Sequence, residues 1–188
     1  IGIPNDPSER MTDQQTRNNH YVPQWYQRGF LAPGQSRLFH LNLDPDRKTL
    51  PDGRQVPRKA LHEWGPVNCF VEHDLYTTKF GAIINDDIEK GLFGALDHQG
   101  SKAVHAFVRG DPSEVHESFQ DFFTYLAAQK LRTPKGLDWI RSCYGPLDQV
   151  DLMVEMQALR MMHCTMWAEG VREIVSATDS DVKFIVTD

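Results

Sequence analysis

The sequence predicts an α+β fold, in which three or four long helices of a single helix-rich domain pack on a small, mainly antiparallel sheet. Short β-type segments fill the chain up to about residue 80, whereas the spacing of apolar residues becomes helical from Asn85 onward. The second half also carries helix start and stop signals in the form of capping residues, prolines and glycines. We expect residues 1–19 to form a flexible N-terminal segment and residues 20–188 to form the domain.

A short helix is expected over residues 23–31, inside a stretch that is rich in aromatic residues. Pro23 fixes its own φ and favours an extended Val22, so a new element begins there, and proline is tolerated in a first helical turn. Helical spacing places Tyr26 with Phe30 on one face and Trp25 with Arg28 on another. The simplest interpretation is a helix docked by its aromatic side chains, with Arg28 reaching solvent.

Strands are expected next. Residues 37–43 alternate, with Leu38, His40 and Asn42 on one face and Phe39, Leu41 and Leu43 on the other. The elements that should follow are turns at residues 44–46 and 51–53, a short partner strand at Gln55-Val56, one or two helical turns over residues 58–64, and a β-type run over residues 74–80.

Four long helices complete the chain. The first begins at Asn85 and ends near Arg109, with a possible break at residues 98–101 because of its glycines. Asp111 should cap the second, over residues 112–131, and Thr133-Pro134 should end it and cap a third over residues 135–143. A last helix is expected over residues 148–176, followed by a strand over residues 182–187. The core stripe of this last helix should contain Met153, Met156, Met161, Met162, Met166 and Trp167.

Charge is unevenly distributed along the chain. The net charge is −6, yet residues 1–70 carry nine Lys/Arg against seven Asp/Glu, and residues 71–188 carry eleven against nineteen. The positive residues concentrate in one loop region, with Arg47, Lys48, Arg54, Arg58 and Lys59. Such a cluster can contact phosphates, which makes nucleic acid a possible partner, although a solvated loop is the commoner explanation.

Composition favours a cytoplasmic protein. No apolar run approaches the roughly 20 residues that span a bilayer, so no membrane association is expected, and residues 1–10 lack the features of a signal peptide. Met11 is a more natural start, so residues 1–10 are interpreted as upstream readthrough or a remnant. Three cysteines without a Cys-x-x-Cys pair indicate buried free thiols in a reducing compartment.

Familiar catalytic and cofactor motifs are missing, so we expect neither a cofactor nor a metal. There is no phosphate loop, dinucleotide-binding loop, Gly-x-Ser-x-Gly or His-Glu-x-x-His. Glu72-His73-Asp74 could offer metal ligands, but three consecutive residues face one ion only in a tight turn.

A scattered polar set remains for chemistry. His20 suits proton transfer near neutral pH, and Arg28 and Arg132 offer fixed charges that match phosphate or carboxylate. If the fold brings the two arginines together, either they flank an anion or each pairs with an acid such as Glu89 or Asp188. Tyr21 completes the candidate catalytic residues. The candidate ligand-binding residues are Trp25, Tyr26, Glu89 and Asp188.

The opening stretch His20-Tyr21-Val22-Pro23-Gln24-Trp25-Tyr26-Gln27-Arg28-Gly29-Phe30 resembles the signature of the bacterial and phage family called domain of unknown function 4238. Further similarity lies at residues 68–76, 88–89, 129–134 and 184–188. Family members usually continue past the final Ser/Thr-Asp with a proline and more sheet, so we expect a C-terminal portion to be missing here. The resemblance implies an architecture and candidate positions, because the family carries no settled activity.

Two functions follow as hypotheses. The first, which the sequence favours, is a phosphodiester hydrolase, an RNase-like or defence-associated nuclease. His20 would act as general acid/base in it, Arg28 and Arg132 would stabilise charge, and Tyr21 would position the substrate. The second is a non-catalytic module whose signature is architectural and which recognises a partner through Trp25, Tyr26 and the basic loop. Oligomeric state is left open.

Overall fold

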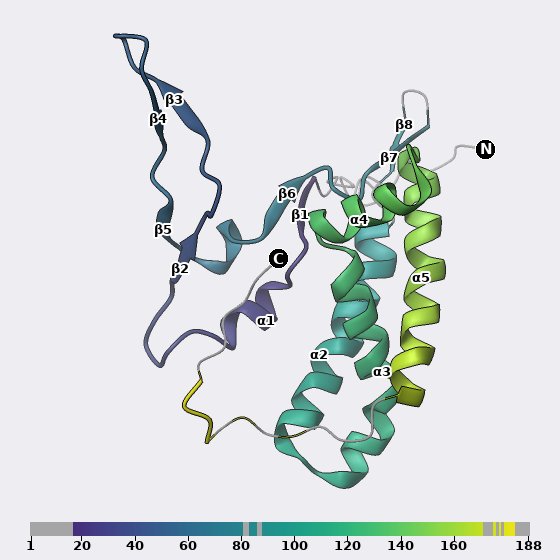
Figure 1. Ribbon diagram of the computed structural model, residues 1–188. Coiled ribbons are helices and arrows are strands. Elements are labelled where there is room, and N and C mark those ends of the chain that lie inside the picture. Colours follow the sequence, from purple (N-terminus) through teal and green to yellow (C-terminus); the bar gives the residue numbers. More distant parts are fainter. Residues whose placement is uncertain are drawn as a thin grey trace, which may run out of the picture.

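The computed structural model describes residues 17–80, 83–85, 88–170, 175, 177 and 179–182 of the chain. Helices dominate this part, and the expected α+β class is confirmed. The helical elements are α1 (Gln24–Arg28), a 3₁₀ turn η2 (Pro66–Asn68), a π-helical stretch η3 (Ile88–Phe93), α2 (Gly94–Arg109), α3 (Pro112–Leu131), α4 (Pro134–Tyr144) and α5 (Gln149–Gly170). In Figure 1, α2, α3 and α5 lie side by side as the body of the molecule.

The strands form four separate two-stranded antiparallel sheets within the described residues. They are β1 (Asn18–His20) with β6 (Val71–His73), β2 (Leu38–Leu41) with β5 (Leu61–Trp64), β3 (Arg47–Thr49) with β4 (Gln55–Pro57), and β7 (Thr78–Phe80) with β8 (Ile83–Asn85). The β-type run expected over residues 74–80 is only partly a strand, because residues 74–76 form a turn and residues 78–80 form β7.

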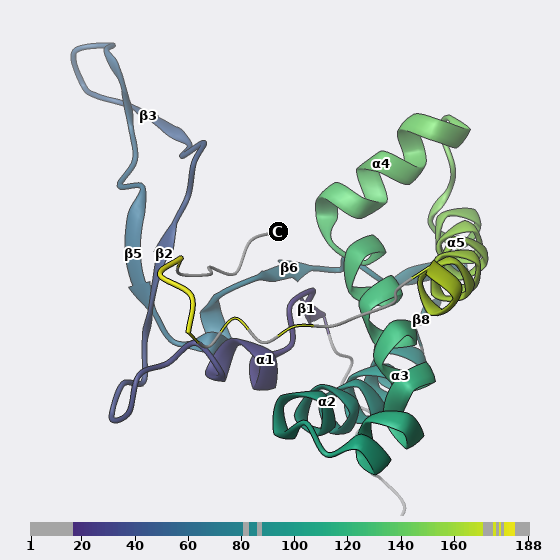
Figure 2. The ribbon, with the colours of Figure 1, turned by 60° about the horizontal axis from the view of Figure 1, so that its bottom comes forward.

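Residues 38–64 form one long hairpin, which we call the arm. Figures 1 and 2 both show it projecting away from the helices. The expected alternation is confirmed over residues 38–41, because Leu38 and His40 are half-buried while Phe39 and Leu41 are exposed. The strand is shorter than expected: it ends at Leu41, and a bend follows at residues 43–44. The expected helical turns over residues 58–64 are wrong, since residues 61–64 pair as a strand with residues 38–41.

Local signals set the helix boundaries. The Asp111 side chain accepts hydrogen bonds from the backbone N–H groups of Ser113 and Glu114, and Gly110 ends α2 with a φ of 73°. The Thr133 hydroxyl likewise accepts from Gly136 N at 3.0 Å and begins α4. These expected caps are confirmed.

One helix prediction fails, because α2 runs without a break through residues 98–101. Asn85 is the last residue of β8, and the helical structure described after it begins at Ile88. The glycine that was expected to weaken α2 instead allows close packing: a Cβ on Gly100 would lie 2.3 Å from Cδ2 of Tyr125. The first helix is also shorter than expected, spanning residues 24–28.

The core lies where α4, α5, the end of α3 and Tyr76 meet. Its members are Tyr76, Phe93, Leu131, Leu137, Ile140, Leu152, Met153, Met156 and Leu159. The predicted methionine stripe of α5 is half correct, because three of its members, Met161, Met162 and Met166, are exposed. Beyond Leu159 the buried stripe does not continue through these methionines. Most of residues 171–188, including residues 183–187 of the expected final strand, lie outside the described residues.

Candidate functional site

Backbone hydrogen bonds hold the opening segment in place. Strand β1 pairs with β6, and Tyr21 N donates to the Phe70 carbonyl at 3.0 Å. The buried Gln27 side chain extends this attachment by donating from Nε2 to the carbonyls of Val22 (2.8 Å) and Cys69 (3.2 Å). The segment is therefore fastened along its length to the strand that follows the arm.

The aromatic residues of α1 face the helices. The Trp25 ring lies 5.4 Å from the Tyr125 ring and 6.1 Å from the His105 ring, and it meets the Tyr26 ring edge-on at 5.7 Å. Tyr26 in turn lies 5.5 Å from Phe30, the pairing expected from helical spacing. The structure thus uses Trp25 and Tyr26, two predicted ligand-binding residues, in packing contacts.

Gln129 joins the opening segment to Arg132. Its Nε2 donates to the Tyr21 carbonyl at 2.7 Å, while its Oε1 accepts from Arg132 Nε at 3.0 Å and from Nη2 at 2.8 Å. Because both ends of the amide are used, one side chain fixes the position of the signature relative to the end of α3.

Arg132 is buried, with a relative exposure of 1%. Its Nη2 lies 2.7 Å from Asp97 Oδ1, its guanidinium lies 5.3 Å from the centroid of the Phe93 ring, and its carbonyl accepts from the Tyr76 hydroxyl at 2.6 Å. Of the two arrangements considered from sequence, this one is an arginine paired with an acid. The acid is one that the sequence reasoning missed. Asp97 lies three residues before the buried Gly100, on the same face of α2, and that spacing is the signal that could have found it.

Burial and charge act in opposite directions on this ion pair. Burial works against the charge of Arg132, but Asp97 and Tyr76 outweigh it and raise the pKa of the guanidinium. Burial also raises the pKa of Asp97, and the attraction of Arg132 offsets only part of that rise. The pair is therefore costly to bury, and either partner alone would be more costly.

His20 and Arg28 lie on the surface, apart from Arg132. His20 Nε2 lies 3.0 Å from the Val67 carbonyl, so that nitrogen carries the proton and Nδ1 is the acceptor in the neutral ring. Gln24 stands between the two residues: its Oε1 accepts from Arg28 Nη2 at 3.1 Å, and its Nε2 lies 3.4 Å from His20 Nε2. The structure brings together His20 and Arg28, and separately Tyr21 and Arg132.

The two remaining candidates lie outside what the structure describes. Asp188 is in the undescribed C-terminal residues, and the side chain of Glu89 is likewise undescribed although its backbone belongs to η3. Among the described residues, no group of three or more His, Cys, Asp or Glu side chains could hold a metal ion.

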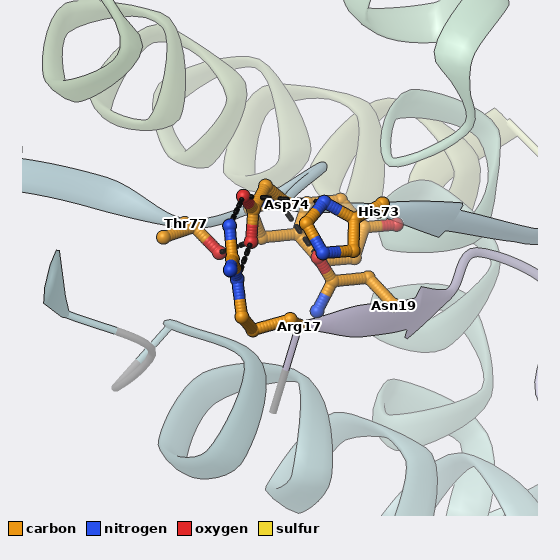
Figure 3. Close-up of polar contacts among 6 residues, drawn as sticks. Arg17, Asn19, His73, Asp74 and Thr77 are labelled. Atoms are coloured by element: carbon orange, nitrogen blue, oxygen red, sulfur yellow. Dashed lines mark hydrogen bonds and ion pairs between the residues drawn. The ribbon is translucent and has the colours of Figure 1, made fainter. Parts of the chain in front are cut away.

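A polar cluster surrounds Asp74, which was considered from sequence only as a possible metal ligand with Glu72 and His73. Figure 3 shows the Arg17 guanidinium on the carboxylate of Asp74, with His73 and Thr77 beside it. Arg17 Nε donates to Asp74 Oδ1 at 2.9 Å, His73 Nδ1 lies 3.3 Å from Oδ2, and Thr77 Oγ1 donates to Oδ1 at 3.3 Å. Asp74 has a φ of 58°, in the left-handed region that ends β6 in a turn.

Two pockets adjoin this cluster. One of ≈330 Å³ is lined by Asp74, Thr77, Asp148, Gln149 and Val150. The other, of ≈220 Å³, has eight lining residues and shares Asp74 and Gln149 with the first. The signature residues His20 and Arg28 line neither pocket, so the geometry separates the pockets from the predicted catalytic residues.

The Asp74 cluster predicts an acid-sensitive contribution to stability. Hydrogen bonding by Arg17 lowers the pKa of Asp74 to about 2. Because the pKa of Asp74 is lower in the folded state than the unfolded value of about 3.9, its carboxylate stabilises the folded state fully at pH values above about 3.9. This stabilisation is lost as the pH falls through the folded-state pKa. Urea unfolding should show Asp74→Asn to be less stable than wild type at neutral pH, with the difference vanishing near the folded pKa. An Asp121→Asn control, at an exposed position of α3, should show no such pH-dependent difference, and a difference for Asp74→Asn that persists in acid contradicts the assignment.

Comparison with known proteins gives a family and nothing beyond it. A family model described as "Protein of unknown function (DUF4238)" matches residues 18–158. No curated protein and no solved structure matches the chain. In the described residues, no helix has the length and apolar character needed to cross a membrane.

Proposed function

This chain belongs to the DUF4238 family, and we propose that it is a binding module that holds double-stranded DNA with its arm. One observation carries the proposal: a two-stranded ribbon with exposed, largely unpaired cations stands at the far end of the arm, away from the acidic helices. The ribbon is β3 with β4.

The cations of the ribbon are available to a ligand. Arg47, Lys48, Arg54, Arg58 and Lys59 are all exposed. Within the described part of the chain, a carboxylate pairs with only one of these five, Arg54, whose Nε lies 2.7 Å from Asp52 Oδ2. Lys and Arg side chains that lack an internal partner can neutralise phosphates and release their counterions.

The register of the ribbon groups three of these cations. Lys48 pairs with Val56 across the ribbon. The hydrogen bonding continues on both sides: Leu50 N donates to the Arg54 carbonyl at 2.8 Å, and Arg58 N donates to the Asp46 carbonyl at 2.7 Å. Alternation then places Lys48, Arg54 and Arg58 on one face. A two-stranded ribbon is one of the two elements that the major groove of B-DNA admits, which favours duplex DNA over RNA as the ligand.

The net negative charge of the chain does not oppose this interaction. Strand geometry places Lys48 roughly 20 Å from Leu41 along the arm, and the arm projects from the body in both views (Figures 1 and 2). Salt screens charges over about 10 Å at about 0.1 M. The ribbon therefore presents a local positive field to a ligand.

The signature supports a module more than an enzyme. Arg132 is buried against Asp97, and Tyr21 donates and accepts through its backbone to hold β1 in place. Two of the four predicted catalytic residues are therefore engaged in scaffolding contacts, and Arg132 in particular does not reach solvent.

Binding should depend on the ribbon and on salt. We expect the Lys48→Gln/Arg58→Gln variant to bind a fluorescent duplex roughly ten- to fiftyfold more weakly than wild type at moderate salt, with a shallower dependence of log K on log salt, by roughly 1.8. Fluorescence anisotropy over a salt series measures both. The Lys102→Gln/Lys135→Gln variant removes the same charge from exposed helix positions and should bind like wild type. Equal weakening by both pairs, or no duplex binding by wild type, contradicts the proposal.

Phosphodiester hydrolysis is a second candidate function, favoured by the setting of His20. The Val67 carbonyl holds the Nε2 proton, which leaves Nδ1 as a base, and Gln24 aligns the Arg28 cation on the same surface. Val67 follows the end of β5, so this pair lies near the base of the arm.

A cleavage assay, combined with the binding assay above, separates the two functions. If the chain is a hydrolase, incubating wild type with labelled DNA or RNA gives cleavage, and His20→Ala abolishes it while the affinity for duplex stays within about threefold. Cleavage that His20→Ala leaves intact, or none by wild type, removes the hydrolase and leaves the binding module. Circular dichroism of the variant confirms that it is folded.

A further inference from the structure

One face of the arm is apolar and uncovered. Three large side chains share it, with relative exposures of 73% for Phe39, 56% for Leu41 and 48% for Leu61. Leu43, which is 87% exposed, lies in the bend just beyond Leu41. We call the three side chains, together with Lys59 and Glu63 beside them, the outer face. An exposed cluster of this kind on a soluble domain marks an interaction site more often than chance placement does.

The opposite face of the same two strands is already occupied. His62 stacks on Trp64 with ring centroids 4.3 Å apart, and His40 stacks on Trp64 at 5.1 Å and meets Phe70 edge-on at 5.7 Å. An isolated two-stranded ribbon is marginally stable in water, so one that also exposes three large apolar side chains on one face calls for a second layer.

The outer face is complementary to itself. Phe39 pairs with Glu63, and Leu41 pairs with Leu61. Alternation along the strand of Leu61 places Lys59 on the same face, two residues further toward the tip. Relative to a line drawn through Leu41 and Leu61, Glu63 therefore lies two residues to one side and Lys59 lies two residues to the other side. Both belong to the strand that contains Leu61 and to its continuation toward the tip.

We propose that two copies of this chain pack outer face to outer face, about a two-fold axis along that line. The axis reverses the strand direction of the second copy. Leu41 and Leu61 then meet their own equivalents, and Glu63 meets Lys59 of the second copy. Such a contact is isologous and closes on itself, as expected for a homodimer.

The size of the face determines the strength of this association. Three exposed apolar side chains on each copy, with Lys59 and Glu63 beside them, bury less than about 1,000 Å² in total, which is below the size of standard specific interfaces and typical of weak association. The dimer should therefore form in a concentration-dependent equilibrium. It uses the face opposite to Lys48, Arg54 and Arg58, so it does not rest on the proposed DNA binding.

Charge exchange tests the register. Sedimentation velocity over a wide concentration range should show a monomer–dimer equilibrium for wild type. Lys59→Glu and Glu63→Lys should each raise the dissociation constant about tenfold, because the symmetry turns one substitution into two repulsive contacts. The double variant Lys59→Glu/Glu63→Lys restores both ion pairs in reverse, and its dissociation constant should return to within about threefold of wild type. Both side chains are exposed, so the variants should fold.

Two results overturn the proposal. One is a wild type that sediments as a monomer at every concentration. The other is a double variant that associates no better than the single variants, which would mean that Lys59 and Glu63 do not meet across the axis.

A disulfide trap gives an independent readout. In a Cys143→Ser background, Leu41→Cys places a thiol at the axis and should yield a crosslinked dimer under mild oxidation. Asn42→Cys is the matched control, because it is the exposed neighbour on the opposite face and should not crosslink. Equal crosslinking at both positions, or none at Leu41→Cys, contradicts the assigned face.

Discussion

Replacing Arg132 by alanine is expected to lower the free energy of unfolding by about 3–5 kcal/mol. The substitution leaves the Asp97 carboxylate without its cation and removes the donors to Gln129 Oε1. It also leaves a space beside Phe93 that the surrounding core fills only in part. Urea unfolding followed by tryptophan fluorescence measures the loss, and a loss below about 1 kcal/mol contradicts the structural role given to this arginine.

A paired variant separates the charge from the packing. Arg132→Met/Asp97→Leu removes both charges and fills the space with apolar atoms, so it should recover much of the stability that Arg132→Ala loses. Asp97→Asn alone should be strongly destabilising, because it leaves Arg132 buried without a counterion. If Asp97→Asn is neutral, the ion pair does not hold α2 to the end of α3.

Gly100→Ala is expected to destabilise the protein by about 1–3 kcal/mol. At an exposed helical site the same change stabilises by about 1 kcal/mol, so the expected sign is reversed here. A Cβ at this position would lie 2.3–2.8 Å from three atoms of Tyr125, whose ring is buried and supports Trp25 of the opening segment. The clash should displace Tyr125 and with it the seat of α1.

Gly170→Ala is the matched control, because nothing lies within 4 Å of a Cβ built at the end of α5. Thermal unfolding should show it to be as stable as wild type or more so. A Gly100→Ala variant that gains stability by a similar amount would mean that α2 and α3 do not approach as closely as the structure has them.

Features that depend on neighbouring residues could be read from the sequence. The caps at Asp111 and Thr133 form within three residues of the side chain that makes them, and the faces of residues 38–41 follow from strict alternation. The helical turns expected over residues 58–64 failed because pairing with a distant strand decided their conformation, which local propensity does not encode.

How the candidate residues are grouped could not be predicted. The sequence left open whether Arg28 and Arg132 meet; the structure places Arg28 beside Gln24 and pairs Arg132 with Asp97. The connection from Arg132 to the opening segment runs through Gln129. The contacts of Arg132 with Asp97 and of Gln129 with the opening segment join residues far apart in the chain, and several acids could have filled the role of counterion. The exposure of Met161, Met162 and Met166 shows the same limit, since apolar composition alone does not say where a packed face ends.

These observations assign different tasks to different parts of the chain. The signature segment, Gln129 and Arg132 build a scaffold at the junction of α1, α2 and α3. The arm that follows the signature presents a basic ribbon at its tip and an apolar outer face nearer its base. The proposed DNA binding and the proposed dimer therefore depend on the arm, while the signature keeps the arm in place.

Hydrogen exchange of the opening segment is the most direct test of this division. In Arg132→Met, the backbone amides of residues 18–28 should lose at least about tenfold in protection, because the anchor through Gln129 is weakened, while those of residues 47–57 at the arm tip should be unchanged. Unchanged protection over residues 18–28 in a folded Arg132→Met variant would contradict the account, because the signature would then hold its position without the buried arginine.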